Sequence, residues 1–158
     1  MHFQHRCSLP VRTHDDGRAH VAVQRHQRRA AFPCETDRVD ASNSELVVGH
    51  TDSDAESIAR RLPSSHVVAS LQATPSELLL DVFEARASSP RPNIVYCGDH
   101  APSKERAAAL LGQIGFDPVD AGPLRIARPA EPFGKLATAL AYGHEEGPKW
   151  VYHFSRLK

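Results

Sequence analysis

The feature that most constrains the fold is an alternation of strand-like and helix-like segments after about residue 44. Strands are predicted at 45–49, 66–71, 93–97, 117–121 and 149–155. The segments between them have helical periodicity. Strict alternation is typical of a parallel sheet whose crossovers are helices. We therefore predict an α/β fold with a parallel, Rossmann-like sheet and flanking helices.

The predicted helices carry their own boundary signals. Two begin with the spacing of a capping box, Ser53 with Glu56 and Thr74 with Glu77. A third helix begins at Pro102 and ends at Gly115, and a fourth ends at Gly143. The residues expected to face the sheet are Ala107, Leu110, Leu111 and Ile114 on the third helix and Phe133, Leu136, Ala137 and Leu140 on the fourth.

Three loops follow the second, third and fourth predicted strands, at 72–74, 98–100 and 122–124. In a parallel sheet the carboxyl ends of the strands share one edge, and ligands bind there. Gly122 would let the backbone approach a ligand closely, and Pro123 would stiffen the turn. The sequence therefore predicts that these loops lie together around a cleft. A plain connector without a ligand is the alternative for 122–124.

The order of these motifs resembles a known family. The strand Ile94-Val95-Tyr96-Cys97-Gly98-Asp99 is followed by the helix at 102–114 and then by 115–124, which ends in Ala121-Gly122-Pro123-Leu124. Upstream, the segments 46–51 and 66–75 fit the same pattern. Residues 44–158 resemble the carboxyl-terminal half of the NADP(H)-dependent reductases of the deazaflavin coenzyme, the coenzyme F420-dependent NADP oxidoreductases.

The resemblance implies hydride transfer between NADP(H) and a deazaflavin, both small-molecule cofactors. It places Gln72, Thr74, Gly122, Pro123 and Leu124 around the cofactor rings. The family often has His or Asn where this chain has Gln72, which puts a polar contact to the rings in doubt. No catalytic acid or base is implied, because the cofactors supply the chemistry.

Family members begin with a strand and a glycine-rich turn that holds the pyrophosphate. Here Gly17 is the first glycine and Gly49 the second, so the motif is absent from this sequence. We predict that 44–158 is the carboxyl-terminal part of a reductase domain without its nucleotide-binding half. The alternative is a non-enzymatic, truncated or partner-dependent subunit that binds no nucleotide, and homo-oligomerisation stays open.

Residues 1–43 are predicted to be a basic leader without regular structure. Residues 1–33 hold six Arg and five His but only two acids, whereas 34–158 hold thirteen Lys and Arg against seventeen Asp and Glu. A nucleic-acid or membrane-surface arm, a transit peptide, and the product of a displaced start or frame shift are the alternatives. We favour the last, because no periodicity is visible. The acidic body disfavours nucleic acid as a partner.

Other chemistries have weaker support. His2, His5 and Cys7 lack a second close pair of ligands, so no metal site is predicted. A Ser70, His50 and Asp99 triad has no G-x-S-x-G elbow to expose the serine. Arg125 and Arg128 lie three apart and could clamp an anion, with Glu131 near enough to pair with either. No apolar run approaches the roughly 20 residues that span a bilayer, and Cys97 suits a reduced cytoplasmic protein.

Overall fold

The computed structural model describes residues 19–23, 51–145 and 147–157. Within these residues there are four strands and four helices, with a short 3-10 helix, Leu124–Ile126, before the last helix. The strands are β1 (Ala19–Val23), β2 (His66–Ser70), β3 (Asn93–Gly98) and β4 (Asp117–Asp120). The helices are α1 (Asp54–Arg61), α2 (Leu78–Glu84), α3 (Ala101–Ile114) and α4 (Ala127–Gly143). The predicted α/β class is confirmed.

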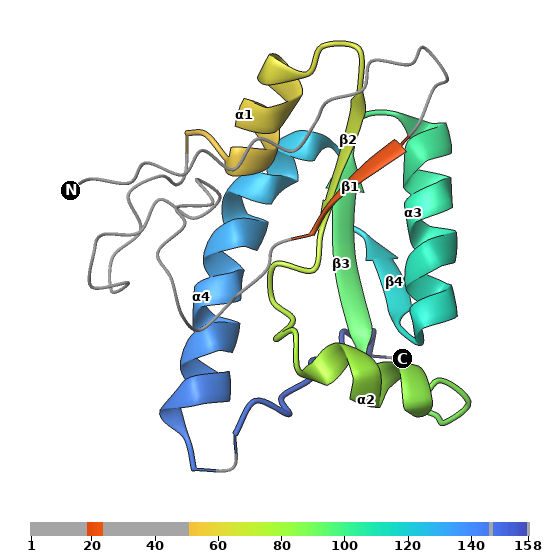
Figure 1. The fold of residues 1–158 in the computed structure, drawn as a ribbon, viewed down its shortest axis with the longest axis vertical. Coiled ribbons are helices and arrows are strands. Elements are labelled where there is room, and N and C mark those ends of the chain that lie inside the picture. Colours follow the sequence, from red (N-terminus) through yellow and green to blue (C-terminus); the bar gives the residue numbers. More distant parts are fainter. Residues whose placement is uncertain (1–18, 24–50, 146, 158) are drawn as a thin grey trace, which may run out of the picture.

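The four strands form one sheet in the order β1-β2-β3-β4. β1 is parallel to β2, and β3 is parallel to β4, but β2 is antiparallel to β3, with Ala69 opposite Cys97. Figure 1 shows α3 on one side of the sheet, α1 and α4 on the other, and α2 at the end where β3 begins. The sheet is therefore mixed, and the prediction that it is parallel throughout is wrong at the β2–β3 pair.

The short α2 is consistent with the reversal. The seven residues of α2 span only about 10 Å, whereas the fourteen residues of α3 span about 21 Å and connect the parallel β3–β4 pair. The chain leaves β2 and enters β3 at the same end of the sheet.

Two other strand predictions are corrected. The predicted lack of regular structure in the leader is wrong for 19–23, because β1 pairs with β2 from Ala19 opposite His66 to Val23 opposite Ser70. The strand predicted at 149–155 is not a strand, although this segment hydrogen-bonds to β3. The strand predicted at 45–49 lies outside the described residues.

The core has two parts, one on each face of the sheet. On the α3 side the buried residues are Val68, Leu71, Leu78, Val82, Ile94, Tyr96, Ala107, Leu111 and Phe116. On the α1 and α4 side they are Ala55, Val67, Ala69, Cys97, Leu124 and Ala127. Successive residues of β2 thus enter opposite cores, as the two-residue period of a strand requires. β2 is buried on both faces, so its backbone edges need partners on both sides.

The predicted helix boundaries at Ser53, Gly115 and Gly143 agree with the structure, and the one at Thr74 does not. Ser53 caps α1 by accepting from the Glu56 N–H (3.2 Å), and Gly115 ends α3 with φ +122°. Any Cβ on Gly115 would lie 2.6 Å from the Val82 carbonyl oxygen, so glycine is required there. The predicted capping box of Thr74 and Glu77 is wrong, because α2 begins only at Leu78.

The reason lies in the partners of these two residues. The Thr74 N–H donates to the Leu71 carbonyl in a turn (3.2 Å), and the Glu77 carboxylate accepts from the Tyr142 hydroxyl (3.0 Å).

Two residues that were predicted to face the core are exposed, since Leu110 and Leu136 keep 46% and 56% of their surface in solvent. On α4 the small residues Gly134 and Ala141 are buried instead, which lets this helix lie close to the sheet.

Candidate functional site

The antiparallel β2–β3 pair separates the predicted site residues into two groups. Gln72 and Thr74 follow β2, at the end of the sheet where β3 begins. Gly122, Pro123 and Leu124 follow β4, at the opposite end, beside the loop that follows β3. The prediction that all three loops share one edge is therefore wrong. The five residues do not line a single cleft formed by that edge.

The turn at 122–124 is held by side chains of the chain itself. Gly122 has φ +107°, its N–H donates to the Asp120 carboxylate (2.8 Å), and the Leu124 N–H donates to Asp99 (2.8 Å). Lys104 binds both the Gly122 carbonyl oxygen (3.1 Å) and Asp120 (2.7 Å). Burial alone would raise the pKa of Asp120, but Lys104 and the Gly122 N–H lower that pKa overall. These two N–H groups are therefore already used within the turn.

The loop at 72–75 lies at a gap in the sheet. β2 ends at Ser70, and Leu71 takes a left-handed conformation with φ +68°, which turns the chain away from β3. The pairing of β2 with β3 accordingly reaches only Ser70 opposite Tyr96. Earlier residues of β3 need other hydrogen-bond partners on this side.

The segment 147–157 supplies those partners, and we call it the C-terminal segment. Its Tyr152 carbonyl accepts from the Asn93 N–H (3.0 Å), and its Tyr152 hydroxyl accepts from the Val95 N–H (3.2 Å). The Val95 carbonyl accepts from the Ser70 hydroxyl (2.9 Å). The Asn93 side chain accepts from the Phe154 N–H. Burial raises the pKa of Tyr152, against the opposing effect of the hydrogen bond from the Val95 N–H.

A mainly apolar cavity of about 190 Å³ lies at this gap. Its lining comes from the loop after β2, from β3, from α4 and the turn before it, and from the C-terminal segment: Gln72, Ala73, Val95, Ile126, Pro129, Ala130, Phe133, Tyr152 and Phe154. The rings of Phe133 and Tyr152 meet edge to face with centroids 5.3 Å apart. This cavity can take an apolar ring with one polar contact from the Gln72 carboxamide.

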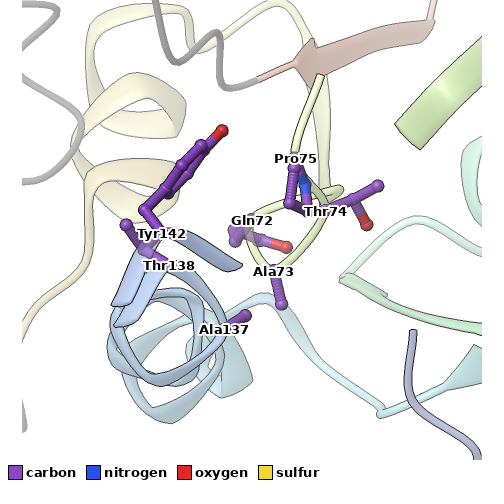
Figure 2. Close-up of a pocket in the computed structure, with 7 residues that line it drawn as sticks. All are labelled: Gln72, Ala73, Thr74, Pro75, Ala137, Thr138 and Tyr142. Carbon is purple, nitrogen blue, oxygen red and sulfur yellow. The ribbon is translucent and has the colours of Figure 1, made fainter. Parts of the chain in front are cut away.

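A smaller hollow lies farther along α4. Figure 2 shows the loop residues Gln72 to Pro75 on one side of it and Ala137, Thr138 and Tyr142 of α4 on the other. Its volume is about 10 Å³, which is room for about one water molecule. Thr74 therefore lies beside the loop's contact with α4, and Gln72 contributes to both cavities.

The charged residues near α1 form internal pairs. Arg128 makes two 2.8 Å bonds to the Glu56 carboxylate, so the alternative in which Arg128 clamps a bound anion is not supported. The Glu131 carboxylate accepts from the Asp54 and Ala55 N–H groups (2.9 and 3.1 Å) at the start of α1. Arg128 lowers the pKa of Glu56 against the opposing effect of burial. The start of α1 is thus neutralised by the chain's own carboxylate.

The remaining candidates have structural partners. The Ser70 hydroxyl is bound to Val95 and Asp99 to the Leu124 N–H, while His50 lies outside the described residues. The rings of His66 and His100 stack 3.6 Å apart. Within the described residues no group of three or more His, Cys, Asp or Glu side chains is placed to hold a metal ion, and no helix is long and apolar enough to cross a membrane. The His2, His5 and Cys7 cluster lies outside them.

Sequence reasoning missed Phe133, Tyr152 and Phe154 as site residues. The aromatic residues at 150, 152 and 154 alternate in the last segment, and this alternation was the available signal. A strand prediction for 149–155 does not connect these side chains with the loop after β2.

No family model matches this sequence, and no curated protein matches it. Among solved structures, the chain is similar to a protein from Arthrobacter sp. FB24 that was assigned as an F420-dependent NADP reductase. The two share 28% identity with a TM-score of 0.62, over 71% of this chain and 50% of the other. The chain thus spans about half the length of that protein. This similarity supports a distant relation to F420-dependent NADP reductases and agrees with a partial Rossmann-like fold.

Proposed function

We propose that this chain forms the ring-binding part of an NADP(H)-dependent oxidoreductase that transfers hydride to or from a deazaflavin. The observation that carries the proposal is the apolar cavity between the loop at 72–75 and α4, in a chain similar to an F420-dependent NADP reductase. In this proposal Gln72 belongs to the ring site, Thr74 lines only the small hollow beside it, and Gly122, Pro123 and Leu124 form the turn that precedes α4.

The described residues suit the ring of such a cofactor better than its phosphates. A pyrophosphate needs free N–H groups at a helix start or a glycine turn. At α1 the Asp54 and Ala55 N–H groups donate to Glu131 and the Glu56 N–H to Ser53. In the 122–124 turn the N–H groups of Gly122 and Leu124 are likewise taken by carboxylates. Neither the start of α1 nor the 122–124 turn therefore offers free N–H groups to the NADP(H) phosphates at these positions.

The proposed roles of the chain's own residues are binding, orientation and exclusion of water. Hydride transfer is the chemistry that the nicotinamide and the deazaflavin supply when bound. Phe133, Pro129 and Ile126 give the site apolar walls, and the Gln72 carboxamide gives it a donor and an acceptor. No proton has to be held or moved by a side chain in this scheme.

The occupied N–H groups favour a second candidate as well, a subunit that needs a partner to bind the nucleotide. Calorimetric titration of the full chain with NADPH, and with the deazaflavin, tests both candidates. We expect the deazaflavin to bind through its ring. We expect NADPH not to saturate the chain at low micromolar concentration. Saturation by NADPH would remove the partner-dependent candidate, and failure to bind either compound would remove the ring-binding proposal.

An activity measurement completes this test. NADPH and the deazaflavin are mixed with the chain alone, and then with the unmatched half of the Arthrobacter protein as a separate polypeptide. Deazaflavin reduction only in the second mixture would support the partner-dependent form of the proposal. Reduction by the chain alone would show that it binds the nucleotide without help.

A further inference from the structure

Helix α4 is apolar on the side away from the sheet as well as on the side toward it. Its buried residues Ala127, Gly134 and Ala141 recur every seven positions, or about two turns, and mark the inner face. The opposite side of the helix carries six residues that have neither a charge nor a hydrogen-bonding side chain: Pro129, Pro132, Leu136, Ala139, Leu140 and Gly143. We call these six residues the outer face of α4.

The outer face is open to solvent in the part of the chain that the structure describes. Leu136, at its middle, keeps 56% of its surface exposed, and Pro129, Ala139 and Gly143 are exposed as well. A surface helix ordinarily carries polar residues on the side away from the core, and a helix that is apolar all round is ordinarily buried. The composition of α4 therefore predicts a partner on its outer face.

The charged residues of the first half of α4 do not reach the outer face. Arg128 is bound to Glu56 of α1, and Glu131 accepts from the N–H groups at the start of α1. Figure 1 shows α1 beside the starting end of α4. The polar side of α4 is thus turned to α1, which leaves the outer face to apolar contacts.

The two ends of α4 carry opposite charges, each with the unfavourable sign for the dipole of the helix. The exposed Arg125 precedes the helix at its positive end, whereas Glu145 and Glu146 follow it at its negative end. A second α4 lying antiparallel would bring its acidic end to the basic end of the first, and the reverse. The charges therefore complement those of another copy of the same helix, in one orientation.

The spacing of the outer face fits the same orientation. A twofold axis beside Leu136 places this residue opposite its own copy, Pro132 opposite Leu140, and Pro129 opposite Gly143. Large residues of one helix thus meet small or ring-shaped residues of the other. Such a contact is isologous, the commonest form of homodimer interface. The helix is only about 25 Å long and about 10 Å wide, so its face is far smaller than the roughly 800 Å² per partner of a stable interface.

We propose that the outer face of α4 binds the outer face of a second copy of this chain, as an antiparallel helix pair around a twofold axis beside Leu136. The small contact makes this dimer weak and reversible. The pairing requires no cofactor and no hydride transfer, so it is independent of the proposed function.

Sedimentation equilibrium of the full chain over roughly 1–500 μM, the range of weak complexes, tests the proposal. We expect monomers at the low end and dimers at the high end. Leu136→Lys places two like charges at the axis and should raise the dissociation constant at least about tenfold. The matched control is Leu110→Lys, at a leucine of α3 that is 46% exposed, and it should leave the dissociation constant unchanged. Circular dichroism checks that both variants fold.

A charge exchange tests the antiparallel orientation. Arg125→Glu and Glu145→Arg should each weaken the dimer roughly two- to fivefold, the range for an exposed ion pair. The double variant restores opposite charges between the copies and should recover the wild-type dissociation constant. In a parallel pair like ends would meet, and the double variant would gain nothing. Failure of the double variant to recover would overturn the inference.

Other partners for the outer face give different results. Self-association that Leu136→Lys leaves unchanged would place the contact elsewhere, for example at a strand edge, and would overturn the inference. A chain that stays monomeric up to the highest concentration would also overturn it. Binding of that monomer to the unmatched half of the Arthrobacter protein, or to vesicles of neutral phospholipid, with loss of binding in Leu136→Lys, would assign the face to that partner instead.

Discussion

Gly134 of α4 touches the backbone of Gln72, so closely that a Cβ on Gly134 would lie 2.5 Å from the Gln72 carbonyl oxygen. A backbone oxygen cannot rotate away as a side chain can. Absence of a side chain at position 134 therefore sets the distance between α4 and the loop after β2. The same distance sets the width of the cavity that both elements line.

Gly134→Ala should therefore destabilise the protein by about 1–3 kcal/mol, the range for overpacking, and should move α4 away from the loop. The control is Gly112→Ala in α3, where a Cβ would meet nothing within 4 Å. That substitution should stabilise by about 0.5–1 kcal/mol through helix propensity. Urea unfolding of both variants measures the difference, and destabilisation of equal size in both would contradict this account.

Glu131 acts as a distant cap for α1, across 76 and 77 positions of sequence. Glu131→Ala leaves two N–H groups at the start of α1 without this acceptor and should cost about 2 kcal/mol, at the upper end for loss of a helix cap. Glu131→Gln keeps one acceptor oxygen and should cost less. Thermal unfolding monitored by circular dichroism compares the two, and an alanine variant as stable as wild type would show that water replaces the carboxylate.

The Glu56–Arg128 pair predicts a pH dependence of stability. The hydrogen bond from Arg128 lowers the pKa of Glu56 below its ordinary 4.5 in the folded state. The pair therefore stabilises the fold above about pH 4.5, and this stabilisation is lost as the pH falls through the folded-state pKa. Arg128→Met should lower the unfolding midpoint at pH 7 but make little difference at strongly acidic pH. Arg86→Met, at an arginine stacked on Phe83, should give a difference that does not vary with pH in this way.

Cys97 is predicted to be chemically inert in the folded protein. Burial raises the pKa of its thiol from 9.0 to about 12, and the side chain is fully buried in the core on the α4 side. Because alkylation needs the thiolate, the reaction with iodoacetamide at pH 8 should be roughly a thousandfold slower than for an ordinary cysteine. Mass-spectrometric mapping of the peptide that contains Cys97, with and without urea, measures the protection. Rapid modification without urea would mean that the β3–α4 contact opens readily.

β1 pairs along one edge of β2. Apart from His66, the residues of β2 are buried. Deleting residues 1–24 removes β1 and leaves the backbone of 66–70 without this partner, next to the buried Val67 and Val68. Such an edge pairs with other chains, so the shortened protein should form dimers or aggregates. Light scattering after size exclusion detects them. A stable monomer after the deletion would show that β1 contributes little to the sheet.

The sequence predicted those elements whose signals are local. Pro102 and Gly115 bracket α3 to within one residue, and Ser53 marks the start of α1. The parallel direction of β3 was predicted from the alternation of strands and helices alone, and this alternation does not reveal that the connection through the seven-residue α2 is antiparallel. Because the sheet was predicted to be parallel throughout, the loops at 72–74 and 122–124 were assigned to one edge.

Other parts of the structure depend on contacts that sequence patterns do not encode. β1 lies in a basic segment and is a strand because β2 offers it an edge, not because of its own periodicity. Tyr152 joined the candidate site because its hydroxyl and carbonyl reach N–H groups about 60 residues earlier. Gln72 was found because its loop follows a clear strand, but its neighbour Gly134 could not be inferred from helical spacing.

The pairing of Val95 with Tyr152 also has a consequence for synthesis of the chain. The two residues are 57 positions apart, so at translation rates of about 5–20 residues per second the Val95 N–H waits roughly 3–11 seconds for its partner to be made. During that time part of β3 is an open edge in a nascent chain, where neighbouring polysomal chains can pair with it. Residues translated well after β3 thus complete the hydrogen bonding of β3, and a nascent chain cut short before Tyr152 would keep that edge open permanently.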